Sequence, residues 1–160
     1  MGIGANVGDV TVPILMFADD MVLMAEKEEE LQALVEKVKE YCDEWKLEIN
    51  VGKTKVMVVS KDGSTSTRIT YGTEMLECVR EFTYLGTVFT ADGKWEKEVE
   101  RRTQAGRAAL GGISKQVVWN RTISVKVKKV LFSPLVKSRL TYGGDVWWPS
   151  KAEMGKLETV

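Results

Sequence analysis

Residues 10–25 read VTVPILMFADDMVLMA, two apolar runs on either side of the adjacent carboxylates Asp19 and Asp20. Short apolar runs around a polar pair are typical of two antiparallel strands joined by a tight turn. Ionised groups beside an apolar body are costly unless they are paired or bind a cation, and Mg²⁺ prefers carboxylate oxygens. The stretch therefore predicts a hairpin with a candidate metal site at its tip, against the alternative of a solvated turn that is merely acidic.

The chain after this hairpin first predicts a helix and then short strands. Residues 26–46 carry apolar side chains at intervals of three and four, with three glutamates near the start that suit the helix dipole. A turn around Asn50 and Gly52 leads into a strand through Val56 and Val59. Further short strands are expected around residues 68–71, 74–77 and 82–89.

Beyond residue 93 the apolar period changes from two to about 3.6, which indicates helices. One helix is expected to extend past Gly111 and Gly112, which favour a bend, and a second to span residues 124–140 with a kink at Pro134. The fold class is therefore α+β in the first part and helical in the second. We expect a border near Thr90, which gives domains at residues 1–90 and 91–160.

Composition narrows the possible chemistry of this 160-residue chain. It contains no histidine, which excludes histidine-based catalytic triads and imidazole metal ligands. The cysteines Cys42 and Cys78 are too few for a zinc site or a disulfide framework. There is no run of 18 apolar residues and no secretory leader pattern, so we expect an intracellular protein without a membrane partner, in the nucleus or the cytoplasm.

Charge is unevenly distributed although the net charge is zero. Residues 1–80 hold 9 Lys+Arg against 15 Asp+Glu, whereas residues 81–160 hold 14 against 8. Between residues 101 and 151 there are 11 basic residues and one acidic residue, Asp145. Such a basic segment favours nucleic-acid binding, with a solvated helix face as the plainer alternative.

Four blocks of sequence carry a family resemblance. They are PILMFADDMVLMAE at residues 13–26, EYCDEWKLEINVGKTKVMVV at 40–59, FTYLGTVFTADGKWEKEVERRTQAGRAAL at 82–110 and LTYGGDVWW at 140–148. In this order and spacing they resemble the palm-to-thumb portion of reverse transcriptases of LINE-type (non-LTR) retroelements. The resemblance covers about residues 10–148, and it implies a partial palm followed by a helical thumb.

The resemblance also implies roles for particular residues. Asp19 would bind catalytic Mg²⁺ with support from Asp20, and Lys53 would assist the pyrophosphate leaving group. The primer grip, which holds the primer end, would comprise Phe82, Tyr84, Leu85 and Gly86. The thumb would contact an RNA–DNA duplex through six basic residues: Arg101, Arg102, Arg107, Lys126, Lys128 and Lys129.

One departure from the family pattern concerns the metal site. The family also uses a carboxylate from an earlier strand, and the only acidic residue before the hairpin here is Asp9. We therefore expect a reverse transcriptase fragment that binds Mg²⁺ weakly and is inactive alone, unless an upstream polymerase fragment completes it. Self-association through an exposed sheet edge is expected as well. The alternatives are a non-enzymatic nucleic-acid-binding protein derived from a retroelement, or a relic without function.

Overall fold

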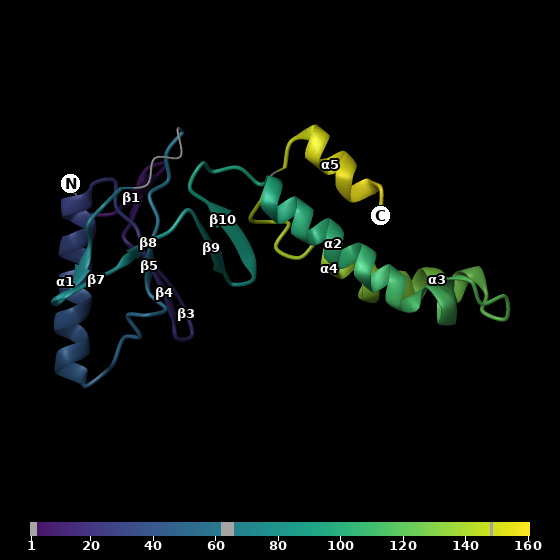
Figure 1. Cartoon of the computed structure of the whole chain (residues 1–160), viewed down its shortest axis with the longest axis horizontal. Helices are drawn as coiled ribbons and strands as arrows, with labels where there is room; N and C mark the ends of the chain where they lie inside the picture. Colours follow the sequence, from purple (N-terminus) through teal and green to yellow (C-terminus); the bar gives the residue numbers. More distant parts are fainter. Residues whose placement is uncertain (1–2, 62–65, 148) are drawn as a thin grey trace. The chain divides into compact units, whose positions relative to one another are not determined.

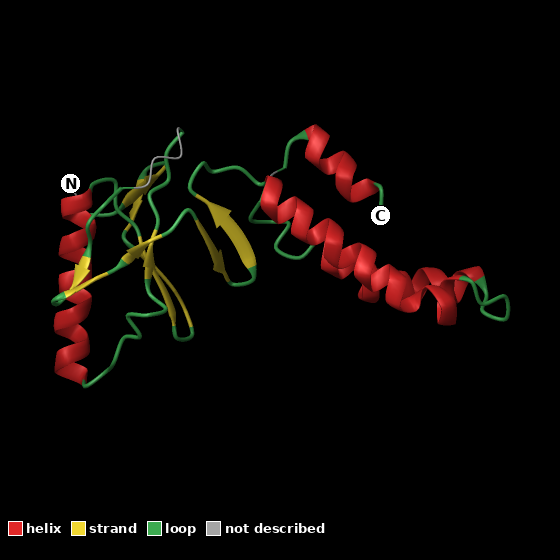
Figure 2. Cartoon of the chain, viewed as in Figure 1, coloured by secondary structure: helices red, strands yellow, loops and turns green. Residues whose placement is uncertain are grey.

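The computed structural model describes residues 3–61, 66–147 and 149–160, which form two compact units. The first unit is Met1–Arg80 and the second is Glu81–Val160. The first combines one long helix with short paired strands, and the second combines one hairpin with helices (Figures 1 and 2). The α+β class predicted from the sequence is confirmed.

The first unit is built from short strands and a single long helix. Strands β1 and β2, β3 and β4, and β6 and β7 form antiparallel pairs, whereas β5 pairs with β8 in parallel. The strands are β1 (Ala5–Val7), β2 (Val10–Val12), β3 (Ile14–Phe17), β4 (Asp20–Leu23), β5 (Lys55–Val56), β6 (Thr70–Tyr71), β7 (Glu74–Met75) and β8 (Glu77–Cys78).

Pro13 divides the stretch that the sequence presents as one apolar strand. Because proline lacks a backbone N–H, it interrupts a strand ladder. β2 ends at Val12 and pairs with β1, while β3 begins at Ile14 and pairs with β4. The backbone N–H of Met24 donates to the Pro13 carbonyl at 2.9 Å, which closes the open end of the β3–β4 hairpin. The predicted hairpin around the two aspartates is therefore present, but it is shorter than expected.

Helix α1 (Glu28–Trp45) confirms the predicted amphipathic helix and covers a small core. That core contains Val35, Val56, Ile69 and Leu76, each less than 9% exposed. The Gln32 side chain fixes the helix to β6, because its amide donates to the Thr70 carbonyl and accepts from the Thr70 N–H. The Gln32 amide thus takes the place of a neighbouring strand and satisfies both the N–H and the carbonyl of Thr70.

The second unit contains the β9–β10 hairpin and a set of helical segments packed on α2. Contacts place α4, α5 and the η2 segment along α2, and Figure 1 shows α4 and α5 beside this helix. The elements are β9 (Glu81–Tyr84), β10 (Thr87–Thr90), α2 (Glu96–Ile113), η1 (Ser114–Val118), α3 (Val125–Phe132), η2 (Ser133–Lys137), α4 (Ser138–Leu140) and α5 (Lys151–Glu158). Within the described ranges, no helix is long and apolar enough to span a membrane.

The predicted second helix at residues 124–140 is present as the continuous run α3, η2 and α4. Pro134 lies in the π-helical segment η2 rather than at a break. The backbone N–H of Ser138 reaches the Ser133 carbonyl five residues back, so the wider turn accommodates a residue that cannot donate. Likewise, α2 continues through Gly111 and Gly112, and the π-helical segment η1 follows it.

The boundary between the compact units differs from the expected border near Thr90. The β9–β10 hairpin belongs to the second unit, which begins at Glu81. The physical reason is that α2 holds this hairpin: Val88 donates its N–H to Glu98, and Arg101 and Arg102 donate to the Gly86 carbonyl. In the sequence, the strand period of residues 82–89 groups them with the strands before them. The side-chain contacts from α2 to the hairpin produce no periodic pattern, so the sequence does not indicate them.

We predict that Gly106→Ala destabilises the second unit by about 1–3 kcal/mol, the usual cost of overpacking. A Cβ atom at Gly106 would overlap Cδ2 of the buried Leu140 and lie 2.7 Å from its Cγ. Gly111→Ala is the matched control in the same helix, because nothing lies within 4 Å of its added Cβ. This control should gain up to about 1 kcal/mol from helix propensity. Urea unfolding followed by circular dichroism checks both, and equal stabilisation by the two variants would contradict the packing.

Candidate metal site and nucleic-acid interface

Asp19 and Asp20 lie at the tip of the β3–β4 hairpin. Phe17 pairs with Asp20 across the ladder, so Ala18 and Asp19 form a two-residue turn. Ala18 has a φ of 52°, a left-handed value that favours glycine and strains a residue with a Cβ. The tip is thus a tight, strained turn that presents two neighbouring carboxylates to solvent.

The surroundings of the two carboxylates leave them available to a cation. Among the residues that the structure describes, neither aspartate forms an ion pair or a side-chain hydrogen bond, and no group of three possible metal-ligating residues occurs. Proteins commonly hold Mg²⁺ through one or two carboxylates, with water and substrate phosphates as the remaining ligands. The donor set at this tip therefore fits one hydrated Mg²⁺ ion.

Lys53 lies in the turn that precedes β5 and is exposed. The Asn50 side chain accepts a hydrogen bond from the Lys53 backbone N–H at 3.0 Å, and the Asn50 carbonyl accepts a second one. These bonds fix the backbone, while the ammonium group forms no ion pair within the described ranges. In the part of the chain that the structure describes, no hydrogen bond or ion pair joins Lys53 to the aspartates, so its role in leaving-group stabilisation stays a prediction.

The residues expected as a primer grip lie on the β9–β10 hairpin. Tyr84 pairs with Thr87, so Leu85 and Gly86 form the turn, and both have positive φ angles of 46° and 76°. Positive φ at both positions is typical of the type I′ turn that closes two-residue hairpins. The side chains of Phe82 and Leu85 are 38% and 40% exposed, so both are accessible to a ligand.

A buried ion pair supports this turn from helix α2. Glu98 is fully buried, and its carboxylate accepts from the Arg102 guanidinium and from the Val88 N–H at 2.9 Å. Arg102 also donates to the Gly86 carbonyl, and its Cζ atom lies over the Tyr142 ring, 4.6 Å from the ring centroid. Buried charges are tolerated when they are paired and fully hydrogen-bonded, as they are here.

Arg102 is therefore not the exposed phosphate contact that the sequence suggested. Its residue exposure is 7%, and its guanidinium is already shared between Glu98 and Gly86. An arginine enclosed in this way cannot reach a duplex without breaking the pair. We assign it a structural role, which corrects the expectation that the basic face includes this residue.

The other basic residues of the expected interface differ in how free they are. Arg101 is half exposed and donates to the Gly86 carbonyl, and Arg107 donates to the Thr159 hydroxyl. Lys128 donates to the Val118 carbonyl at 2.7 Å and so fixes the connection between η1 and α3. Two exposed lysines of α3 form no ion pair or side-chain hydrogen bond among the described residues: Lys126 and Lys129.

Two residues of this arrangement escaped the sequence analysis: Glu98 and Tyr142. Glu98 lies four residues before Arg102, a spacing that in a helix ordinarily gives an ion pair on the exposed face. Nothing in the sequence therefore indicates that this glutamate is buried. Tyr142 precedes Gly143, whose φ of 68° turns the chain. An added Cβ at Gly143 would lie 2.9 Å from the Thr87 hydroxyl, which explains the glycine beside this tyrosine.

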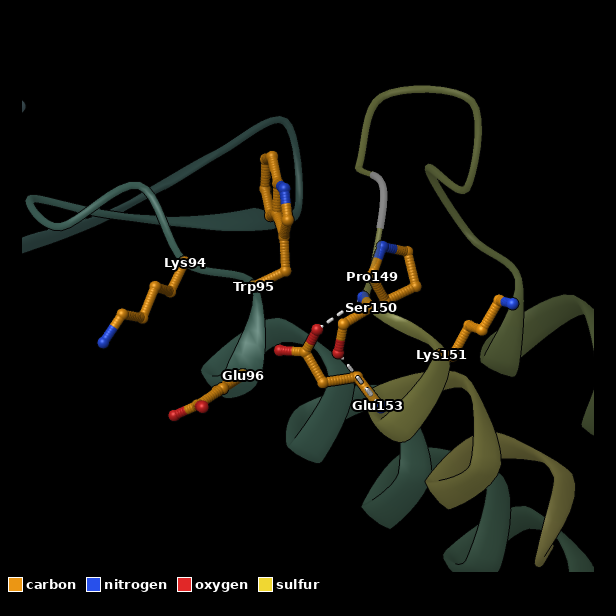
Figure 3. A pocket seen from close by; sticks show the side chains of 7 residues that line it. All are labelled: Lys94, Trp95, Glu96, Pro149, Ser150, Lys151 and Glu153. Atoms are coloured by element: carbon orange, nitrogen blue, oxygen red, sulfur yellow. Dashed lines mark hydrogen bonds between the residues drawn. The ribbon is translucent and has the colours of Figure 1, made fainter.

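A shallow hollow of about 460 Å³ also lies in the second unit, between the starts of α2 and α5 (Figure 3). Ser150 and Glu153 cap α5 there, and hydrogen bonds from Ser150 hold the pKa of Glu153 below its ordinary value. The carboxylate therefore stabilises the fold above the ordinary pKa, and this contribution is lost as the pH falls through the lowered value. None of the predicted site residues lines this hollow.

Comparison with known proteins agrees with the residues of the hairpins. A family model described as reverse transcriptase (RNA-dependent DNA polymerase) matches residues 5–89, which include Asp19, Asp20, Lys53 and the Leu85–Gly86 turn. The chain therefore belongs to the reverse transcriptase family, and the resemblance seen in the sequence is confirmed at that level.

A curated relative is similar to the chain over more residues than the family model. A transposon-derived protein of Caenorhabditis elegans is 36% identical over 145 residues, which cover 86% of this chain and 50% of that protein. The chain thus spans about half the length of this curated relative. No solved structure matches the chain.

We predict that Ala18→Gly stabilises the first unit by about 0.5–1 kcal/mol, because glycine relieves the strain of a positive φ. Gly8 supplies the control: its φ of 61° is also positive, so Gly8→Ala should lose stability by a comparable amount. Hydrogen exchange of the β3 and β4 amides measures the effect locally. A loss of protection in Ala18→Gly would show that neighbouring groups require an alanine at this tip.

Proposed function

We propose that this chain is the palm-to-thumb portion of an RNA-directed DNA polymerase of a LINE-type (non-LTR) retroelement. The observation that carries the proposal is the pair of carboxylates at the β3–β4 tip, which have no ion-pair or side-chain hydrogen-bond partner among the described residues and lie inside the segment that matches the reverse transcriptase family. A rigid hairpin tip is a suitable mount for groups that must hold a metal ion near a reacting phosphate.

In this proposal Asp19 holds Mg²⁺ and Asp20 supports it. Mg²⁺, when bound, stabilises the negative charge that develops on the transferred phosphoryl group. The Lys53 ammonium would act on the departing pyrophosphate, because a cation placed where charge develops lowers the barrier to transfer. Asp19 lies in the strained turn beside Ala18 and Asp20 begins β4, and in this proposal the two carboxylates share one ion.

We further propose that residues 1–160 do not polymerise by themselves. Two-metal phosphoryl transfer needs carboxylates that bridge both ions, and Asp19 with Asp20 leaves that site short of ligands. An upstream polymerase segment would have to supply the remaining carboxylate and the nucleotide-selecting surface. The alternative functions are a retroelement-derived protein that only binds nucleic acid and a relic without function.

Primer extension on an RNA template tests this proposal. We expect no template-dependent incorporation by the purified chain, because the metal site lacks ligands. Incorporation that disappears in Asp19→Ala but persists in Asp9→Ala would contradict the expectation, since Asp9 is exposed and outside the β3–β4 tip. Mixing in the upstream half of a polymerase of this family tests whether a partner segment completes the site.

Duplex binding is proposed to lie on the exposed cations of the second unit. Lys126 and Lys129 carry this proposal, because both are exposed and unpaired among the described residues, and Arg101 and Arg107 keep part of their guanidinium surface open. Backbone phosphates and duplex shape would be read rather than base edges. Arg102 and Lys128 are hydrogen-bonded within the fold, to Glu98 and to the Val118 carbonyl. We therefore expect fewer phosphates to be neutralised than the six basic residues of the expected interface would allow.

We predict that log affinity for an RNA–DNA hybrid falls against log salt with a slope of roughly −2 to −4. The double variant Lys126→Ala/Lys129→Ala should reduce the magnitude of this slope by about two units, because each neutralised phosphate contributes about 0.9. Lys37→Ala is the control, since Lys37 is exposed on α1 in the other unit. Fluorescence anisotropy at several salt concentrations gives the slope, and absence of binding at low salt would favour the relic.

Self-association is a separate proposal about the β3–β4 hairpin. All four residues of β3 are exposed, with Met16 at 66% and Phe17 at 62%, so both faces of this strand present apolar side chains. Apolar strands with open edges pair readily with other chains. We expect concentration-dependent dimers in sedimentation experiments that Met16→Lys suppresses, whereas a monomer at all concentrations would exclude this contact.

A further inference from the structure

The backbone of the β9–β10 turn is held by side chains from outside the hairpin. The Tyr142 hydroxyl donates to the Leu85 carbonyl at 3.0 Å. Arg102 and Arg101 both donate to the next carbonyl, that of Gly86, the second at 2.9 Å. Beyond the turn, the Val88 N–H donates to the buried Glu98 carboxylate. Each side of the turn is therefore fixed to a helix or to the segment after α4.

The segment at residues 141–147 is shaped to reach this turn. A Cβ atom at Gly86 would lie 3.2 Å from the Tyr142 ring, so glycine lets the tyrosine lie against the backbone without displacement of its ring. Trp147 is 4% exposed, and its indole N–H donates to the Tyr142 carbonyl at 3.1 Å. Tyr142, Gly143 and Trp147 of this segment, which have no part in the proposed function above, therefore support the turn.

These contacts determine where the turn lies rather than whether it forms. A type I′ turn with both φ angles positive closes a hairpin through its own ladder, and β9 and β10 are paired in register up to Leu85 and Gly86. The added bonds act on groups that water could satisfy at an exposed turn. At the same time the side chains of Phe82 and Leu85 remain accessible. The turn is thus anchored through its backbone and left open through its side chains.

We propose that Tyr142, supported by Arg102 and Glu98, is a positioning residue that fixes the β9–β10 turn against the primer strand. This inference rests on the proposed function of the hairpin as a primer grip. The ring of Tyr142 stacks on the Arg102 guanidinium, and its hydroxyl acts on the turn through the Leu85 carbonyl. Tyr142 touches no nucleic acid in this scheme, because it acts through the backbone of Leu85 and Gly86.

Site-directed photo-cross-linking of the full chain tests the inference. The photo-reactive residue p-benzoylphenylalanine replaces Phe82, and the probe is an RNA–DNA hybrid with a recessed, labelled primer end. The cross-linked primer nucleotides are mapped in three backgrounds: the unchanged chain, Tyr142→Phe and Tyr41→Phe. Tyr142→Phe removes only the hydroxyl and keeps the ring on Arg102, and Tyr41→Phe is the matched loss of a hydroxyl on α1.

We expect cross-links in the unchanged chain to concentrate on one or two primer nucleotides. In Tyr142→Phe the yield at the main nucleotide should fall roughly threefold to tenfold and spread to its neighbours, which is what one lost hydrogen bond gives. Affinity for the hybrid and the melting temperature should stay near those of the unchanged chain, because the hairpin closes through its own ladder. A merely structural role for Tyr142 would instead change those two values and leave the mapped position as it is.

Three outcomes overturn the inference. Specific cross-links that keep the same pattern in Tyr142→Phe would overturn the positioning role and leave the primer grip standing. Absence of specific cross-links in the unchanged chain would overturn the primer grip itself, and the positioning role with it. Hydrogen exchange of the Thr87 and Val88 amides in the unbound chain is the second measurement, and exchange that does not rise in Tyr142→Phe also overturns the inference.

Discussion

The buried carboxylate of Glu98 is the constraint on which the second unit depends. A fully buried negative charge requires donors from several directions, and Arg102 and the Val88 N–H supply them. Because one donor comes from the same helix and the other from β10, satisfying this single group joins the hairpin to α2. The same arginine then donates to Gly86 and stacks on Tyr142, which extends the constraint to the turn and to the segment after α4.

Hydrogen bonds within the second unit also separate structural basic residues from those open to a ligand. Arg102 and Lys128 are used inside the fold, whereas Lys126 and Lys129 face solvent on α3. The first unit follows a different rule, since a small apolar core lies under α1 while all four residues of β3 stay exposed. Exposed charged side chains thus lie at a strained hairpin tip in one unit, where they are carboxylates, and on a helix in the other, where they are lysines.

Elements with a strong period could be predicted from the sequence, and contacts between distant residues could not. The spacing of apolar residues gave α1 and the helical run at residues 124–140, and the two apolar runs around Asp19 gave the hairpin tip. The shortened β3 follows from Pro13, whose missing N–H is a local property. The membership of β9–β10 in the second unit depends instead on Glu98, whose burial no local pattern reveals. For the same reason Arg102 was expected at the surface.

A double-mutant cycle on Glu98 and Arg102 tests the central claim most directly. Glu98→Gln and Arg102→Met each leave one charge buried without its partner, so each should destabilise the second unit by about 3–5 kcal/mol. The double variant removes both charges and should recover much of that loss, which gives a coupling energy of at least about 2 kcal/mol by urea unfolding. Strictly additive losses, or single variants as stable as the unchanged chain, would show that this pair does not hold the hairpin and α2 together.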